Sequence, residues 1–167
     1  MAFLMASAIV AYTIINGIGP TPTNGRVIRQ LDKILPEKAD GDVMDLGAGW
    51  GRVAIYLARR YLDNRVLAIE NCPPVWLVCW IRAKLSGNTN LTVKLGNIYK
   101  ESLEDAGLVY CYLYPGAMKK LAPQLRFMPP RSVIISNTFS LPDYEVDKTC
   151  QAKDVWKSPL YRYRLSQ

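Results

Sequence analysis

The chain has 167 residues, of which half are hydrophobic and 21% are charged, so its length and composition fit one globular domain with a single core. The formal net charge is +7, but the Lys and Arg residues are scattered, and no run of them is long enough to favour a nucleic-acid partner. There is no histidine, which excludes Ser-His and Cys-His nucleophile pairs. The four cysteines, Cys72, Cys79, Cys111 and Cys150, show no C-x-x-C spacing, so we expect no bound metal.

The chain opens with an apolar segment. The first 25 residues carry no charged side chain, and residues 2–18 are almost wholly apolar. A helix of about 17 residues is at the lower limit for crossing a bilayer, and the basic residues that follow would remain on the cytoplasmic side. Two interpretations stay open: residues 1–18 attach a cytoplasmic protein to the inner face of a membrane, or they form an apolar helix packed on the domain or against a partner.

Residues 19–41 are expected to form a linker and a leading helix. The cluster Gly19-Pro20-Thr21-Pro22-Thr23-Asn24-Gly25 breaks regular structure. Apolar residues then recur at helical spacing from Val27 to Leu35, and Pro36 ends that pattern. The remaining residues, 42–167, are expected to form the main domain.

Within that domain, short apolar runs alternate with helical segments. Strands are predicted over 43–46, 66–70, 91–95, 108–113 and 133–139, with helices over about 52–61, 75–85 and 115–127. This alternation is typical of a parallel sheet with helices on both faces. After residue 140 the rhythm changes, and the segments 154–156 and 160–165 predict a hairpin added antiparallel at the sheet edge.

The most informative segment is the turn after the first predicted strand, Asp45-Leu46-Gly47-Ala48-Gly49-Trp50-Gly51. Glycine has no Cβ and tolerates positive φ, so such a turn lets the backbone pass close to a nucleotide-like ligand. Glu70 ends the second strand about 20 residues later, where βαβ nucleoside sites hold the ribose hydroxyls. The third glycine comes one residue earlier than in the G-x-G-x-x-G pattern, which argues against NAD.

Further polar residues follow the other predicted strands. Ligands of open α/β sheets bind outside the carboxyl ends of the strands, where Asn71, Asn97 and Ile98 are expected to join the glycine turn and Glu70. Tyr112 and Tyr114 come at the end of the fourth strand, on opposite faces, so that at most one is expected to face the site and the other to lie in the core. Asn137 lies near the end of the fifth strand.

These residues carry a family resemblance across most of the chain. Asp45 to Arg52, Glu70, Gly96-Asn97 and the fourth-strand exit resemble motifs I to IV of the class I S-adenosylmethionine (AdoMet) methyltransferases. A finer match is to a subgroup of small membrane-associated protein-lysine methyltransferases that act on the ATP synthase c-subunit or the adenine nucleotide translocator, with bacterial relatives. The features that carry it are the apolar N-terminal segment, Pro20-Thr21-Pro22, Tyr112-Leu113-Tyr114-Pro115-Gly116-Ala117-Met118, Asn137-Thr138-Phe139 and Pro142-Asp143-Tyr144-Glu145.

The resemblance implies a Rossmann-like methyltransferase fold: a mostly parallel seven-stranded sheet with an antiparallel C-terminal hairpin, helices on both faces and an apolar N-terminal helix. It implies AdoMet as cofactor, held by Asp45, Gly47, Ala48, Gly49, Trp50, Gly51, Glu70, Asn71, Asn97 and Ile98. The chain departs from the family pattern at Trp50, where Asp or Thr is more common, and at Asn97, which replaces an acid. Asn97 either caps a turn or hydrogen-bonds the adenine edge.

The implied reaction is methyl transfer to a lysine amine of a protein partner. A lysine loses its proton when it is desolvated, so no histidine base is required, and Tyr112, Tyr114 and Asn137 are the candidates for orienting the amine. Alternatives are an RNA, lipid or small-molecule acceptor, or a non-catalytic scaffold that retains AdoMet.

Overall fold

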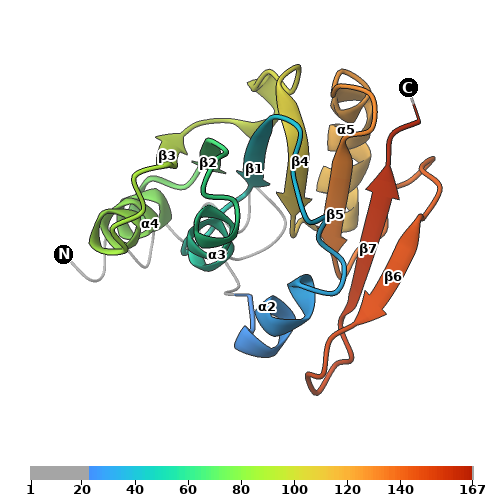
Figure 1. The fold of residues 1–167 in the computed structure, drawn as a ribbon, viewed down its shortest axis with the longest axis horizontal. Helices are drawn as coiled ribbons and strands as arrows, with labels where there is room; N and C mark the ends of the chain where they lie inside the picture. Colours follow the sequence, from blue (N-terminus) through green and yellow to red (C-terminus); the bar gives the residue numbers. More distant parts are fainter. Residues whose placement is uncertain (1–22, 167) are drawn as a thin grey trace.

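A seven-stranded sheet forms the centre of the computed structural model, which describes residues 23–166. The strand order is β3-β2-β1-β4-β5-β7-β6 (Figure 1). Five strands pair in parallel: β1 (Asp42–Leu46), β2 (Val66–Glu70), β3 (Leu91–Leu95), β4 (Ala106–Cys111) and β5 (Val133–Asn137). β7 (Pro159–Arg164) pairs antiparallel with both β5 and β6 (Lys148–Gln151). The predicted sheet with its antiparallel C-terminal hairpin is confirmed, whereas the expected helix over residues 1–18 lies outside the described residues.

Helices cover both faces of this sheet. The described helices are α2 (Gly25–Leu31), α3 (Arg52–Arg60), α4 (Pro73–Leu85) and α5 (Pro115–Leu125), with a short 3-10 helix, η1 (Ile98–Lys100). α2 and α3 pack on one hydrophobic cluster and α5 packs on the other. None of the helices within residues 23–166 is long and apolar enough to cross a membrane.

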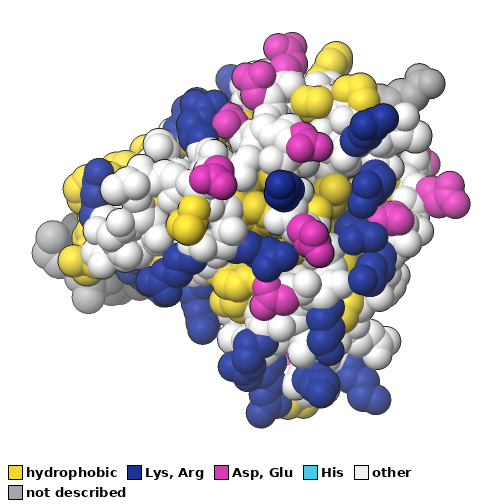
Figure 2. All heavy atoms as spheres, in the orientation of Figure 1, with side chains coloured by type: hydrophobic (Ala, Val, Ile, Leu, Met, Phe, Trp, Pro, Cys, Tyr) yellow, Lys and Arg dark blue, Asp and Glu magenta, His cyan; other side chains and the backbone are white. Residues whose placement is uncertain are grey.

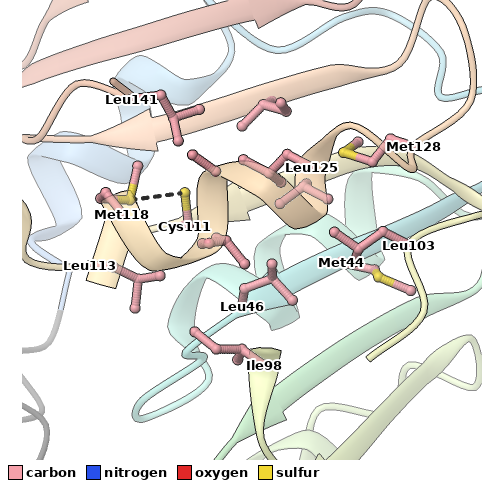
Figure 3. Close-up of a cluster of buried hydrophobic side chains, with 14 of the residues drawn as sticks. Met44, Leu46, Ile98, Leu103, Cys111, Leu113, Met118, Leu125, Met128 and Leu141 are labelled. Atoms are coloured by element: carbon pink, nitrogen blue, oxygen red, sulfur yellow. Dashed lines mark hydrogen bonds between the residues drawn. The ribbon is translucent and has the colours of Figure 1, made fainter. Parts of the chain in front are cut away.

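The two clusters follow from the alternation of side chains along each strand. Met44 and Leu46 of β1 lie in the cluster beneath α5, whereas Val43 lies in the cluster beneath α2 and α3. Figure 3 shows the first of these, in which Cys111 Sγ lies 3.8 Å from Met118 Sδ. The central strands β1, β2, β4 and β5 are therefore buried on both faces, which explains their continuous apolar runs.

Several predicted bounds are wrong. β5 ends at Asn137 and not at 139, α5 ends at Leu125 and not at about 127, and α2 ends at Leu31 and not at about 35. Two further differences have a local reason. β4 ends at Cys111 and not at residue 113, because the chain leaves the sheet to begin α5 at Pro115 with Tyr114 as its N-cap. The predicted hairpin strand 154–156 lies in the loop between β6 and β7. There the carboxylate of Asp154 accepts hydrogen bonds from the backbone N–H and the hydroxyl of Ser158, at 2.8 and 2.7 Å, and closes the loop.

Candidate functional site

The turn after β1 closes around the carboxylate of Glu70. Glu70 ends β2, the neighbour of β1, and is buried. Its Oε2 accepts a hydrogen bond from the Gly49 N–H at 2.8 Å, and its Oε1 accepts from the N–H groups of Asn71 and Cys72 at 3.0 and 2.9 Å. These bonds fix the carboxylate and join the glycine turn to the loop after β2.

The three glycines of the turn have different surroundings, although all have positive φ. A Cβ on Gly47 would lie 2.9 Å from Leu113 Cδ2, and one on Gly51 would lie 2.7 Å from Cys79 Sγ. A Cβ on Gly49, where φ is +52°, would meet no described heavy atom within 4 Å. Gly47 and Gly51 therefore serve close packing, and Gly49 borders the open space that a ligand can enter.

Asp45 lies beside this turn with an unsatisfied oxygen. The residue is 2% exposed, and its Oδ2 is buried with no hydrogen-bond partner among the described residues. Burial, with the charge of Glu70 as a smaller cause, raises the pKa of Asp45 to about 7, although the Ala54 N–H opposes this by hydrogen bonding to it. A buried acceptor without a donor is costly, so the site suits a ligand that brings N–H donors or positive charge.

α4 packs against the glycine turn and fixes its position. Nη1 of Arg82 donates a hydrogen bond to the backbone carbonyl of Trp50 at 2.8 Å, and Cys79 packs against Gly51. Burial raises the pKa of Cys79 to about 12, so its thiol stays protonated and acts as a packing group. Within the turn, the Gly51 N–H donates to the Ala48 carbonyl at 2.9 Å.

The end of β3 contributes Asn97 and Ile98. The Asn97 side chain caps η1, because its Oδ1 accepts a hydrogen bond from the Tyr99 N–H at 3.0 Å. Ile98 is buried in the cluster beneath α5. The capping interpretation of Asn97 is thus confirmed, and a contact with adenine stays a prediction. The Gly96 N–H donates to the Glu70 carbonyl at 3.0 Å, which holds this loop against the end of β2.

The fourth and fifth strands place an aromatic group beside an amide. Tyr112 and Tyr114 are both partly buried and pack on opposite clusters, as expected, although both lie beyond the end of β4. The Tyr112 ring stacks on Phe139, with centroids 6.5 Å apart and planes at 19°. Asn137 is buried at the end of β5, where its Oδ1 accepts a hydrogen bond from the Thr138 hydroxyl at 3.1 Å.

Tyr110 is a residue of this region that the sequence analysis missed. It is 1% exposed, and its hydroxyl accepts a hydrogen bond from the Asn137 amide at 3.1 Å and hydrogen-bonds to Thr23. Burial, more than the nearby charge of Asp45, raises its pKa well above the usual value. Tyr110 thereby connects the residue before the leading helix to Asn137. A tyrosine inside an apolar strand was the available signal, since a buried hydroxyl needs a partner.

The structure therefore gathers the predicted residues at one edge of the sheet, where the parallel strands end. Asp45, the glycine turn, Glu70, Asn71 and Asn97 form one side, and Tyr112, Tyr114 and Asn137 follow the neighbouring strands β4 and β5. Their contacts with a ligand stay predictions. Within residues 23–166, no three Cys, Asp or Glu side chains come together in a group that could hold a metal ion.

Comparisons with known proteins show which family and which relatives this chain resembles. The sequence model described as ANTKMT methyltransferase domain matches residues 45–148. The chain is 22% identical over 135 residues to a protein-lysine N-methyltransferase of Saccharolobus islandicus (strain REY15A), over 80% of this chain and 84% of that protein. The family match begins at Asp45 and contains the glycine turn, Glu70, Asn97 and both tyrosines of the fourth-strand exit.

Solved structures share the fold. An RNA methyltransferase from Salinibacter ruber, in complex with S-adenosyl-L-homocysteine, aligns with a TM-score of 0.78 and 25% identity over 88% of this chain and 95% of that chain. Aeropyrum pernix fibrillarin with natively bound S-adenosyl-L-methionine aligns with a TM-score of 0.66 and 14% identity over 82% of this chain and 73% of that chain.

Proposed function

The chain belongs to the ANTKMT methyltransferase domain family and is an AdoMet-dependent methyltransferase, and from that premise we propose that it transfers the methyl group to a lysine amine of a protein. The observation that carries cofactor binding is the open space at Gly49 beside the fixed carboxylate of Glu70. The lysine acceptor is supported by the name of the Saccharolobus relative.

We call the glycine turn with Asp45 and Glu70 the cofactor edge. It has the groups that AdoMet needs. Glu70 has its two carboxylate oxygens fixed by backbone N–H groups, and Oε2, which accepts only one of these bonds, keeps capacity to accept a hydrogen bond from a ribose hydroxyl. Asp45 has an acceptor without a donor, which suits the positive charge and the ammonium group of AdoMet. When bound, AdoMet supplies a methyl group on a positively charged sulfonium, a strong electrophile.

The acceptor side has to desolvate an amine and align its lone pair with the methyl group. The stacked rings of Tyr112 and Phe139 provide an apolar surface that lowers the pKa of a lysine placed against it. Asn137 Oδ1 accepts one hydrogen bond, from Thr138, and a carbonyl oxygen can accept a second from the amine. A lysine amine held there would release its proton to solvent and present its lone pair to the methyl group that bound AdoMet would supply, with Asn137 orienting the amine and the Tyr112–Phe139 surface excluding water.

The test is to incubate the full-length protein with methyl-labelled AdoMet and a cell extract, and to identify the labelled atom after hydrolysis. We expect methylated lysine. Asn137→Ala should retain AdoMet affinity and lower methyl transfer by about tenfold to a hundredfold, whereas a variant that cannot bind AdoMet loses both. Label in RNA, lipid or a small molecule would contradict the lysine proposal, and binding without any transfer would favour the scaffold alternative.

A further inference from the structure

A basic surface lies beside the acceptor side of the site. In Figure 2, Lys and Arg side chains gather at the lower end of the molecule, over α2 and the hairpin of β6 and β7. We define the basic face as the exposed cations on α2 and just after it, on β6, and in the loop between β6 and β7: Arg26, Arg29, Lys33, Lys148, Lys153 and Lys157. The segment after α2 contacts β6 directly, since Lys148 Nζ donates to the Lys33 carbonyl at 2.8 Å.

Three acidic side chains next to the basic face have partners within the protein. Asp32 pairs with Arg60 at 3.0 Å and accepts a hydrogen bond from the Tyr56 hydroxyl, and Asp147 pairs with Arg162 at 2.5 Å. Asp154 is turned inward to Ser158; those bonds, with the charge of Arg26 as a smaller cause, hold its pKa below the usual value. The positive charge of the face is thus left for an external partner.

An apolar tip projects from the same surface. Val155 and Trp156 are 82% and 84% exposed in the loop between β6 and β7, between Lys153 and Lys157. The Asp154 bonds hold this loop in a defined turn. Trp is enriched among the side chains that contribute most to protein interfaces, so an exposed Trp between two lysines indicates a contact surface.

Both elements border Asn137. The Thr138 N–H donates to the Pro159 carbonyl at 2.7 Å where β7 begins, and Asn137 pairs with Leu160. On the other side, Thr23, which precedes α2, hydrogen-bonds to Tyr110, the partner of Asn137. The end of the β6–β7 loop and the residue that precedes α2 are thus linked to Asn137 through hydrogen-bonded neighbours.

We propose that the basic face and the Val155–Trp156 tip dock the acceptor protein through an acidic segment that carries an apolar side chain next to the target lysine. This inference rests on the proposed lysine methylation. The reason is electrostatic: a lysine in a basic or neutral segment is repelled by the exposed cations, whereas flanking carboxylates reverse the sign of the interaction and steer the segment to the site.

The probes are two short fluorescent peptides with a single lysine, one flanked by Glu and one Leu, the other with Gln in place of each Glu. Anisotropy is measured on the full-length chain with S-adenosyl-L-homocysteine present. The acidic peptide should bind about tenfold or more tightly than the Gln peptide, and added salt should weaken it. The variants Arg29→Glu with Lys157→Glu, and Trp156→Ser, should each weaken the acidic peptide by about tenfold.

Matched controls place the same changes elsewhere. Lys119→Glu with Arg164→Glu alters the same number of exposed charges on α5 and at the far end of β7, and Phe127→Ser removes an aromatic side chain that is 68% exposed. These variants should keep peptide affinity. Equal weakening by the controls, or equal binding of both peptides, overturns the proposal.

Other anionic partners are tested directly. A single-stranded RNA of similar charge and vesicles of anionic phospholipid are added as probes, and tighter binding of either one through Arg29, Lys157 and Trp156 also overturns the acidic-segment proposal. AdoMet affinity is measured by calorimetry on the same samples. Wild-type protein that binds AdoMet normally but does not bind the acidic peptide contradicts this inference alone. Wild-type protein that fails to bind AdoMet contradicts the proposed function.

Discussion

At the scale of single residues, the cofactor edge depends on a glycine that leaves space and a carboxylate that fixes the backbone around it. The sequence identified both, but it could not separate the glycines. Gly47 and Gly51 are confined by Leu113 and Cys79, whereas a Cβ on Gly49 would meet no atom of residues 23–166 within 4 Å. The close contacts come from residues far along the chain, so spacing within the motif carries no information about them.

Gly49→Val should abolish AdoMet binding by placing a side chain where the ligand lies, a loss of at least about 100-fold, or about 2.7 kcal/mol. Gly87 provides the control, because it also has positive φ and open surroundings but follows α4 at the opposite edge of the sheet. Both variants should lose about 1–3 kcal/mol of stability from backbone strain. Calorimetry should show that only Gly49→Val loses AdoMet; equal affinity in the two variants would contradict the assignment.

Asp45→Asn should change how stability depends on pH. The pKa of Asp45 is raised from 3.8 to about 7, so the folded state holds a proton that the unfolded chain has already lost. Wild-type stability should therefore fall as pH rises from about 4 to about 7, by at most about 4 kcal/mol for a pKa rise of about 3. The Asn variant lacks this loss, so in urea unfolding without cofactor its stability relative to wild type should rise from about pH 4 to about pH 7 and level off at higher pH. Parallel pH profiles would refute this account.

At the scale of secondary-structure elements, α4 determines the position of the glycine turn. Its Arg82 holds the Trp50 carbonyl and its Cys79 fills the space above Gly51. The turn therefore depends on a helix that contributes no group to the open space at Gly49.

Gly51→Ala should destabilise the protein by about 1–3 kcal/mol, because the new Cβ would lie 2.7 Å from Cys79 Sγ. Adding Cys79→Ala removes that sulfur, so the double variant should recover part of the loss, and strain from the φ of +77° should remain. A double-mutant cycle of urea unfolding measures the coupling. Additive effects of the two changes would show that the contact has no energetic consequence.

Sequence patterns predicted most elements, for reasons that the structure makes clear. β2 and β3 have the predicted bounds because their apolar runs end at Glu70 and Gly96, where the chain turns. The hairpin loop was misread as a strand, since Val155 and Trp156 have the composition of a strand while Asp154 closes a turn through its side chain. Side-chain hydrogen bonds of this kind compete with strand pairing and leave no periodic signal.

At the scale of the whole molecule, the fold brings together charged residues that are far apart in the sequence. The cations of α2 and of the hairpin are more than 100 residues apart in the chain, yet the Lys148–Lys33 contact joins them on one surface. Scattered basic residues were therefore a correct description of the sequence and a poor guide to the surface. Tyr110 was missed for the same reason, since its partners Thr23 and Asn137 come from distant segments.

Residues 1–18 should be dispensable for AdoMet binding and needed for association with a membrane or a partner. The breaker cluster at 19–25 separates that segment from a domain whose proposed cofactor residues all follow residue 42. Deletion of residues 1–18, with Pro20-Thr21-Pro22 retained, should preserve AdoMet affinity, raise solubility and move the protein from membrane to soluble fractions. Unfolding of the shortened chain would show that the segment belongs to the core. A full-length chain that is monomeric without detergent and does not bind liposomes would contradict membrane anchoring.

The position of β7 has a consequence for biosynthesis. β7 follows all the other described strands in sequence, but it fills an interior place in the sheet, between β5 and β6. On the ribosome, β5 is made before β7, and until then its outer edge is open to pairing with other chains. The buried ring of Tyr163, whose hydroxyl accepts a hydrogen bond from the Leu141 N–H at 2.8 Å, is also missing from the core. Nascent chains that stall before β7 therefore expose the unpaired edge of β5, and we expect chaperones and proteases to bind them.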